Sequence, residues 1–195
     1  MRIQLVASFL ILAFVWPAQA QQRCQNYKQE VRRYHYEVFG VDFPWWYAVG
    51  QLQQESGCRN VISNDGVGSQ GLPQITWLVW KKHLEKQGIH NLKSTASQLR
   101  AQAVINKNTW NQSPIGKLWV SYQIYNGGRL VLKEISRAGS DEWQDARNEC
   151  HRRIISFSNG MRIDACDINY DYSQKIFKYG NQYRTEEDNE KFKYW

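Results

Sequence analysis

The spacing of apolar residues predicts helices over most of the chain. Within residues 21–40, four aromatic and aliphatic residues recur at intervals typical of one face of an amphipathic helix. They are Tyr27, Val31, Tyr34 and Val38. His35 lies in the same segment without a neighbour in the sequence that would make it a metal ligand, so we interpret it as a surface or hydrogen-bonded histidine.

A second helix is predicted to begin near Pro44. Its apolar positions follow at i, i+4 and i+7 and are Trp45, Val49 and Leu52. Asp42 can cap this helix, and Pro44 suits its first turn because proline has a preset φ and no N–H to leave unpaired. Gly57 is a typical residue for the end of a helix. Glu55 is therefore expected in the last turn.

Residues 57–71 are rich in glycine, asparagine and serine, and we expect a loop there with a short hairpin at Asn64-Asp65-Gly66. Further helices are predicted at residues 77–88, 95–110, 116–126 and 141–160. Thr95 and Gln98 fit a capping box at the start of the second of these helices. Gly127 and Gly128 are placed to end the third.

The first 20 residues have the pattern of a secretory signal peptide. Arg2 is a short positive region, residues 5–15 are apolar, and Ala18-Gln19-Ala20 forms an A-x-A cleavage site before Gln21. The apolar run is short for a membrane span, so we expect no stable membrane insertion after signal cleavage, with an uncleaved signal anchor as the open alternative. Residues 21–195 are expected to form one domain, because the segment has no repeat or linker.

Charge and composition narrow the classes of function. Removing Arg2 with the signal leaves 24 basic and 18 acidic side chains, a net charge near +6. An exported basic protein is more suited to an anionic polymer or surface than to nucleic acid, so nucleic-acid binding is disfavoured. The nine tryptophans and 11 tyrosines include core residues, and aromatic rings also stack on sugars, so a saccharide cleft is compatible with them.

Four cysteines follow the signal segment, and they are Cys24, Cys58, Cys150 and Cys166. They form no C-x-x-C pair, and no histidine stands at zinc-finger spacing from them. Export and an even count predict two disulfides, for which three connectivities exist. We expect Cys24–Cys58 and Cys150–Cys166, because these pairs close short loops within each half of the chain.

Glu55 is a candidate general acid. In the last turn it faces the negative end of the helix dipole, and apolar neighbours disfavour its charged form, so both effects raise its pKa. A carboxyl group that stays protonated near neutral pH is what a general acid requires. A glutamate at a helix end is also often an ordinary solvated residue, and spacing alone does not separate the two interpretations.

Three sequence elements resemble the soluble lytic transglycosylase family, over about residues 43–183. They are Glu55-Ser56, then Gly71-Leu72-Pro73-Gln74-Ile75, then Tyr125-Asn126-Gly127-Gly128. The family has an ES pair, a GLMQ-type turn and an AYN-x-G element in this order. The chain departs from the family at Pro73, where methionine is usual, at Ile124, where the family has a small residue, and at Gly127, where alanine is common.

The resemblance implies a predominantly helical α+β fold, namely the lysozyme-like fold of goose-type and lytic transglycosylase domains, with a small irregular β-region beside the acid. It implies cleavage of peptidoglycan between N-acetylmuramic acid and N-acetylglucosamine, with formation of 1,6-anhydromuramoyl ends. Glu55 would act as the single acid and base, with no metal and no cofactor. The expected location is the periplasm or cell envelope, and the expected partner is the peptidoglycan glycan strand.

The resemblance also assigns substrate-binding residues around the acid. They are Ser56, Gln74, Tyr125, Asn126 and Tyr172. Gln74 is expected to bind a sugar acetamido group or to orient the acid, and Tyr125 is expected to point its hydroxyl at the Glu55 carboxyl. Tyr172 matches a tyrosine-containing segment, here residues 169–183, which lines the cleft in many members of the family.

Other functions remain open at this stage. A hydrolytic muramidase would use Asp65 as a second carboxylate that activates water, although an Asp in an Asn-Asp-Gly turn is also ordinary turn chemistry. A non-catalytic wall-binding protein is the other alternative, and the presence of Glu55, Gln74 and Tyr125 argues against it. Wall remodelling, a secretion or conjugation apparatus, and phage lysis are all compatible contexts, with corresponding partner machinery.

Overall fold

The computed structural model describes residues 18–63, 68–151, 154–156 and 162–191. In chain order its elements are α2 (Lys28–Phe39), α3 (Trp45–Ser56), β1 (Ser69–Gln70), β2 (Ile75–Thr76), α4 (Trp77–Lys86), α5 (Thr95–Gln112), α6 (Leu118–Gly127), α7 (Leu130–Ala138), α8 (Trp143–Asn148), β3 (Ile154–Ser156), β4 (Arg162–Asp164), α9 (Ala165–Gly180), the 3-10 helix η1 (Asn181–Tyr183) and α10 (Glu186–Lys191). Residues 18–25 are helical as well. The predicted α+β class, with helix predominating, is confirmed.

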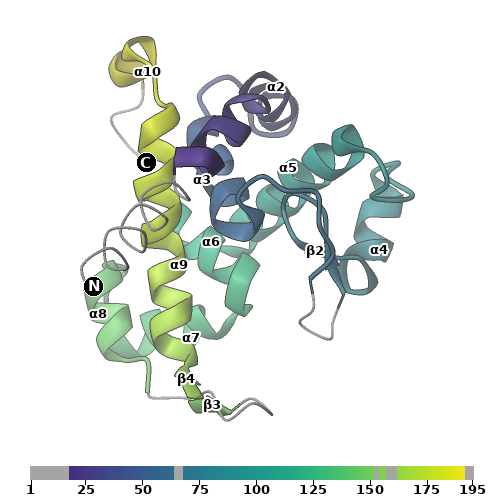
Figure 1. Ribbon diagram of the computed structural model, residues 1–195. Coiled ribbons are helices and arrows are strands. Elements are labelled where there is room, and N and C mark those ends of the chain that lie inside the picture. The colour runs from purple at the N-terminus through teal and green to yellow at the C-terminus, as the bar shows by residue number, and fades with distance from the viewer. Residues whose placement is uncertain (1–17, 64–67, 152–153, 157–161, 192–195) are drawn as a thin grey trace, which may run out of the picture.

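Helix α3 is buried on nearly all sides rather than along one face. Nine of its 12 residues are buried, including the polar Gln51 and Gln53. It packs against α2 and against α9, the long helix that runs from top to bottom in the left half of Figure 1. A helix covered all round belongs to the core, so its polar side chains must find partners inside the protein.

The sequence predicted the C-terminal end of α3 correctly but not its N-terminal cap. Gly57 ends the helix in the left-handed conformation, with φ 60°, as expected for a helix-terminating glycine. Pro44 occupies the N-cap position and no side chain caps the helix, so the predicted cap by Asp42 is wrong. Proline takes this position because its missing N–H removes one of the groups that a cap would have to satisfy.

A pair of glycines lets α3 and α9 come into close contact. A Cβ placed on Gly50 would lie 2.4 Å from the carbonyl oxygen of Ile176 and 2.5 Å from the backbone nitrogen of Gly180. A Cβ on Gly180 would lie 2.5 Å from Cδ1 of Tyr47. Only glycine fits at both positions, so this contact sets the separation of the two helices.

The first sheet is a short hairpin beside the end of α3. Strands β1 and β2 are antiparallel, with Ser69 opposite Thr76 and Gln70 opposite Ile75, and an isolated bridge joins Ile62 to Gln70. In Figure 1 this hairpin and α4 lie on the right of the molecule, opposite α7 and α8. The predicted turn at residues 64–66 lies outside the described residues.

The chain between Cys150 and Cys166 does not form the predicted helix. Helix α8 ends at Asn148, and β3 and β4 then form an antiparallel hairpin in which Ile154 pairs with Asp164. The hairpin returns the chain so that Cys150 bonds to Cys166. A helix continued to residue 160 would instead carry the chain about 15 Å away from Cys150.

Both expected disulfides are confirmed. Cys24 is bonded to Cys58, and Cys150 to Cys166. The first bridge ties residues before α2 to the residue that follows Gly57, and Arg23 Nε donates to the Gly57 carbonyl at 3.0 Å. The end of α3 is thereby held by a covalent bond and a hydrogen bond. None of the helices in the described part of the chain has the length and apolar character of a membrane span.

The α3–α9 contact predicts the effect of a single methyl group. Gly50→Ala should lower the free energy of unfolding by about 1–3 kcal/mol, because backbone atoms of α9 must move, even though alanine favours the helix by about 1 kcal/mol. Urea unfolding measures this loss. Gly127→Ala is the matched control, since the atoms nearest to a Cβ there belong to the Asn169 side chain and not to the backbone of another helix. An equal or larger loss in the control would contradict the assignment.

Candidate active site

The loop between β1 and β2 is locked against the end of α3 through its carbonyl groups. Gly71 O accepts from the Gln74 side-chain amide at 2.7 Å, Leu72 O accepts from Ser56 Oγ at 2.8 Å, and Pro73 O accepts from Tyr125 Oη at 2.8 Å. Three successive carbonyls are thus satisfied by side chains from the loop itself, from α3 and from α6. Such complete pairing is what a buried irregular segment needs to remain ordered.

Gln98 has a different role from the one predicted. The side chain that caps α5 is Ser94, whose Oγ accepts from the Ser97 N–H, so the predicted capping box of Thr95 and Gln98 is wrong. Gln98 is buried, and its Oε1 accepts from the Leu72 N–H at 3.0 Å. Because Ser94, one residue before Thr95, already caps α5, the Gln98 side chain is available to hydrogen-bond the loop between β1 and β2.

Ser56 lies beside the loop and not on the wall of the hollow that contains Glu55 and Gln74. Its hydroxyl donates to Leu72 O and accepts from the Arg59 N–H at 3.1 Å, and the side chain is buried. These bonds position the loop relative to the last turn of α3. Ser56 thus supports the loop, and it also lines a space of about 250 Å³ together with Glu55, so its expected contact with substrate stays a prediction.

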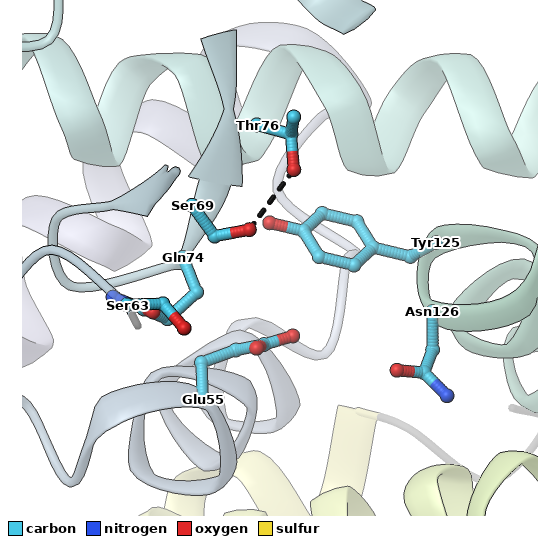
Figure 2. Close-up of a pocket in the computed structure, with 7 residues that line it drawn as sticks. All are labelled: Glu55, Ser63, Ser69, Gln74, Thr76, Tyr125 and Asn126. Carbon is cyan, nitrogen blue, oxygen red and sulfur yellow. Dashed lines mark hydrogen bonds between the residues drawn. The ribbon is translucent and has the colours of Figure 1, made fainter. Parts of the chain in front are cut away.

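Glu55 faces a hollow of about 410 Å³ between the hairpin and α6. Figure 2 shows its carboxyl group directed into this space, with the Tyr125 ring and Asn126 on the opposite side. The lining residues are Glu55, Ser63, Ser69, Gln74, Thr76, Tyr125 and Asn126. The wall is therefore rich in hydroxyl and amide groups, which suits a ligand with many hydrogen-bonding groups.

Two further spaces border residues of this hollow. Glu55 also lines a space of about 250 Å³ that reaches Arg59 and Tyr179. Asn126 also lines a space of about 330 Å³ that reaches Ile168 on α9. Glu55 and Asn126 therefore each border two spaces, and a ligand larger than the central hollow could contact either of them on more than one side.

The environment of Glu55 keeps its carboxyl group protonated to higher pH. Burial raises the pKa of Glu55 from 4.5 to about 7, and the hydrogen bond from Tyr172 opposes this by stabilising the carboxylate. The direction agrees with the sequence-based expectation, and burial is its main cause. A carboxyl with a pKa near 7 can both give and recover a proton at neutral pH.

Tyr172, not Tyr125, is bonded to the Glu55 carboxyl. The Tyr172 hydroxyl, from α9, donates to Glu55 Oε1. The Tyr125 hydroxyl donates to Pro73 O, so the expected bond from Tyr125 to the acid is wrong, although its ring lines the same hollow. The reason is the packing of α9 on α3, which brings together residues 117 positions apart in the chain.

Gln74 and Asn126 both line the hollow and are also held by neighbours. Gln74 has φ 49°, a conformation that non-glycine residues rarely adopt, and its amide donates to Val61 O at 3.1 Å as well as to Gly71 O. Asn126 Nδ2 donates to Asn169 Oδ1 at 3.1 Å. Their remaining polar atoms are the ones placed to meet a ligand.

Sequence reasoning missed two parts of the site. Ser69 and Thr76 face each other across the hairpin and bond through their hydroxyls at 2.9 Å, and strand pairs of two residues are too short to predict from periodicity. Gln51 was also missed as a partner of Tyr172. The available signal was a glutamine one turn before Glu55, among the apolar residues Val49 and Leu52.

Asp65, the candidate second carboxylate, lies outside the described residues. Among the residues that the structure does describe, no group of three His, Cys, Asp or Glu side chains is arranged to hold a metal ion. Comparison with family models, with curated proteins and with solved structures finds no match to this chain.

The raised pKa of Glu55 predicts a pH-dependent gain of stability in Glu55→Gln. Below pH 4.5 the carboxyl is protonated in both states; as pH rises toward 7 the unfolded chain ionises first, so the wild-type protein loses stability. The variant avoids this loss, which amounts to at most about 3 kcal/mol above pH 7. Urea unfolding from pH 4 to 8 measures the difference. Glu37→Gln, on the exposed side of α2, is the matched control, and a pH-independent difference for Glu55→Gln would contradict the burial of its charge.

Removing the hydroxyl of either tyrosine near Glu55 should affect the pKa of Glu55 differently. Tyr172→Phe removes a hydrogen bond to the carboxylate and should raise the pKa of Glu55 by about 1. Tyr125→Phe removes a bond to a backbone carbonyl and should leave that pKa within about 0.3 of the wild-type value. Titration of the Glu55 side-chain carboxyl by ¹³C NMR compares the two variants directly. A larger shift in Tyr125→Phe would reverse the assignment.

Proposed function

We propose that this protein is an exported peptidoglycan lytic transglycosylase with a lysozyme-like fold. The observation that carries the proposal is the Glu55 carboxyl, with a pKa of about 7, in the wall of a hollow lined by hydroxyl and amide groups. Its position in the ES pair, beside the locked turn that carries Gln74, agrees with the resemblance seen in the sequence. Strain at Gln74, whose φ is 49°, is a further feature typical of functional sites.

The reaction begins with proton transfer to the glycosidic oxygen. Because Glu55 Oε1 accepts from Tyr172, Oε2 is the oxygen placed to carry the transferable proton. Glu55 protonates the oxygen between N-acetylmuramic acid and N-acetylglucosamine, and the bond from that oxygen to C1 of the muramic residue breaks. The muramic acetamido group stabilises the cation-like centre at C1. Tyr172 stabilises the carboxylate that this step leaves behind.

The second step returns the proton and closes the ring. The Glu55 carboxylate takes the proton of the C6 hydroxyl, and the C6 oxygen forms a bond to C1. The product has a 1,6-anhydromuramoyl end, and Glu55 is again protonated. Water is not consumed, so one carboxyl group serves both steps, in contrast to the usual pair of carboxylates in glycosidases.

Charge and covalent structure support an extracytoplasmic substrate. The chain without its first 20 residues has a net charge near +6, which attracts a polymer with free carboxylates on its peptide stems. Two disulfides are typical of proteins that fold in an oxidising compartment. The two spaces that Glu55 lines would accommodate sugar units next to the cleaved bond.

The products of peptidoglycan digestion test the proposal. Purified protein with its disulfides formed should release muropeptides that lack one water relative to hydrolytic ends, as measured by mass spectrometry. Reducing muramic ends would instead indicate a hydrolytic muramidase, with Asp65 as the next residue to substitute. Absence of product would favour a wall-binding protein without turnover.

Glu55→Gln should reduce the rate of product release at least about 100-fold, because an amide cannot donate and recover the proton. The wild-type rate should also fall as pH rises through about 7, since the acid is then ionised. The urea unfolding measurement described above is the control that the Glu55→Gln variant is folded. Full activity of folded Glu55→Gln would exclude Glu55 as the acid.

A further inference from the structure

A chain of hydrogen bonds links the acid to the opposite side of the core. Asn106 Nδ2, on α5, lies 3.1 Å from His35 Nε2 on α2 and donates to Gln51 Oε1 at 2.9 Å. Gln51 Nε2 donates to the Tyr172 hydroxyl at 3.3 Å, and Tyr172 donates to Glu55. The four residues that lead to Glu55 are buried, with at most 4% of any side chain exposed. Buried polar side chains such as these need hydrogen-bond partners inside the protein.

The donor and the acceptor of each hydrogen bond in this chain can be assigned by starting from His35, the residue farthest from Glu55. His35 Nδ1 lies 2.9 Å from the Val31 carbonyl, which can only accept, so the ring hydrogen is on Nδ1. The other ring nitrogen, Nε2, is then an acceptor, and Asn106 must present its amide hydrogens to it. Burial lowers the pKa of His35 to about 4, so this neutral form persists throughout the neutral range.

Gln51 is held in one orientation by two donors. Its carbonyl oxygen accepts from Asn106 and from Gln102 Nε2, each at 2.9 Å. Gln102 also donates to Ala48 O at 2.9 Å, which fixes its own amide. Rotating the Gln51 amide by half a turn would place its hydrogens against both donors. Its NH2 group therefore has to face Tyr172.

We propose that Gln51 is a positioning residue that commits the Tyr172 hydroxyl to Glu55. Because the Tyr172 oxygen accepts from Gln51, the single hydroxyl hydrogen is directed to the acid. If residue 51 presented an acceptor instead of an NH2 group, the Tyr172 hydroxyl could donate either to residue 51 or to Glu55. The catalytic consequence of this arrangement rests on the proposed function of Glu55, whereas the hydrogen-bond arrangement itself does not.

A double-mutant cycle on the pKa of Glu55 tests the proposal. Gln51→Met removes the donor without adding charge, and it should raise the pKa of Glu55 by about 0.5, because the bond from Tyr172 weakens. In the Tyr172→Phe background the same substitution should have no effect, since its action passes through the hydroxyl. ¹³C NMR titration of the Glu55 carboxyl gives all four values. An unchanged pKa in Gln51→Met, or an equal rise with and without Tyr172, would overturn the proposal.

Gln53→Met is the matched control on the same helix. Gln53 accepts a hydrogen bond from the buried Tyr183, so its substitution likewise removes a hydrogen bond between a glutamine of α3 and a tyrosine hydroxyl. It should leave the pKa of Glu55 at the wild-type value. A similar rise in both variants would assign the effect to general loosening of α3 and would overturn the role of Gln51.

Gln51→Leu provides a second variant if Gln51→Met does not fold. It likewise removes the donor to Tyr172 without adding charge, so the pKa of Glu55 should rise by about 0.5, as in Gln51→Met. No rise would contradict the proposal. These titrations need no turnover, so they test the role of Gln51 even if the wild-type protein releases no muropeptides. If it does release them, the fall of activity at high pH should move upward by the same amount as the pKa.

Discussion

The burial of one carboxyl group at the end of a buried helix is the constraint on which the rest of the site depends. Helix α3 is enclosed by α2 and α9, so Glu55 leaves the core only in the last turn. There the carboxyl is shielded enough that its pKa rises to about 7, yet it still lines a hollow of about 410 Å³. Shielding raises the pKa and access permits proton transfer, and both follow from this one placement.

Several other features serve to hold this placement. Gly57 and the Cys24–Cys58 disulfide end α3 and anchor the residues that follow it. Gly50 and Gly180 let α9 approach until Tyr172 reaches the acid. The hydrogen bonds from His35 to Gln51 lie behind that contact, in the same core. Helix packing therefore brings Tyr172 to Glu55, and the hydrogen bonds behind Tyr172 satisfy the polar side chains around it. Without either, a buried polar group at this place would lack a partner.

The turn that carries Gln74 shows how an irregular segment becomes a rigid wall. Leu72 is fully buried, its N–H is bound by Gln98, and its carbonyl by Ser56. Pro73 has no N–H to satisfy, and its carbonyl is bound by Tyr125. Proline at a position where the resembled family has methionine is therefore consistent with the hydrogen bonding of this turn.

The sequence by itself determined the local features of this protein. Apolar periodicity predicted α2, α3 and α6, because a helix repeats every 3.6 residues wherever it packs. Gly57 and Gly128 marked helix ends, since few other residues adopt the required conformation there. The cysteine pairing was also predictable, and Glu55 stood out as an acid at a helix end.

Only the tertiary structure decided which side chains meet. It assigned the bond to the acid to Tyr172 instead of Tyr125 and moved Gln98 from a helix cap to the loop. It also ended the helix predicted at residues 141–160 at Asn148 and formed β3 and β4 after it. These outcomes depend on contacts between residues far apart in the chain. Periodicity and capping rules report only neighbours within about four residues, so they cannot rank such contacts.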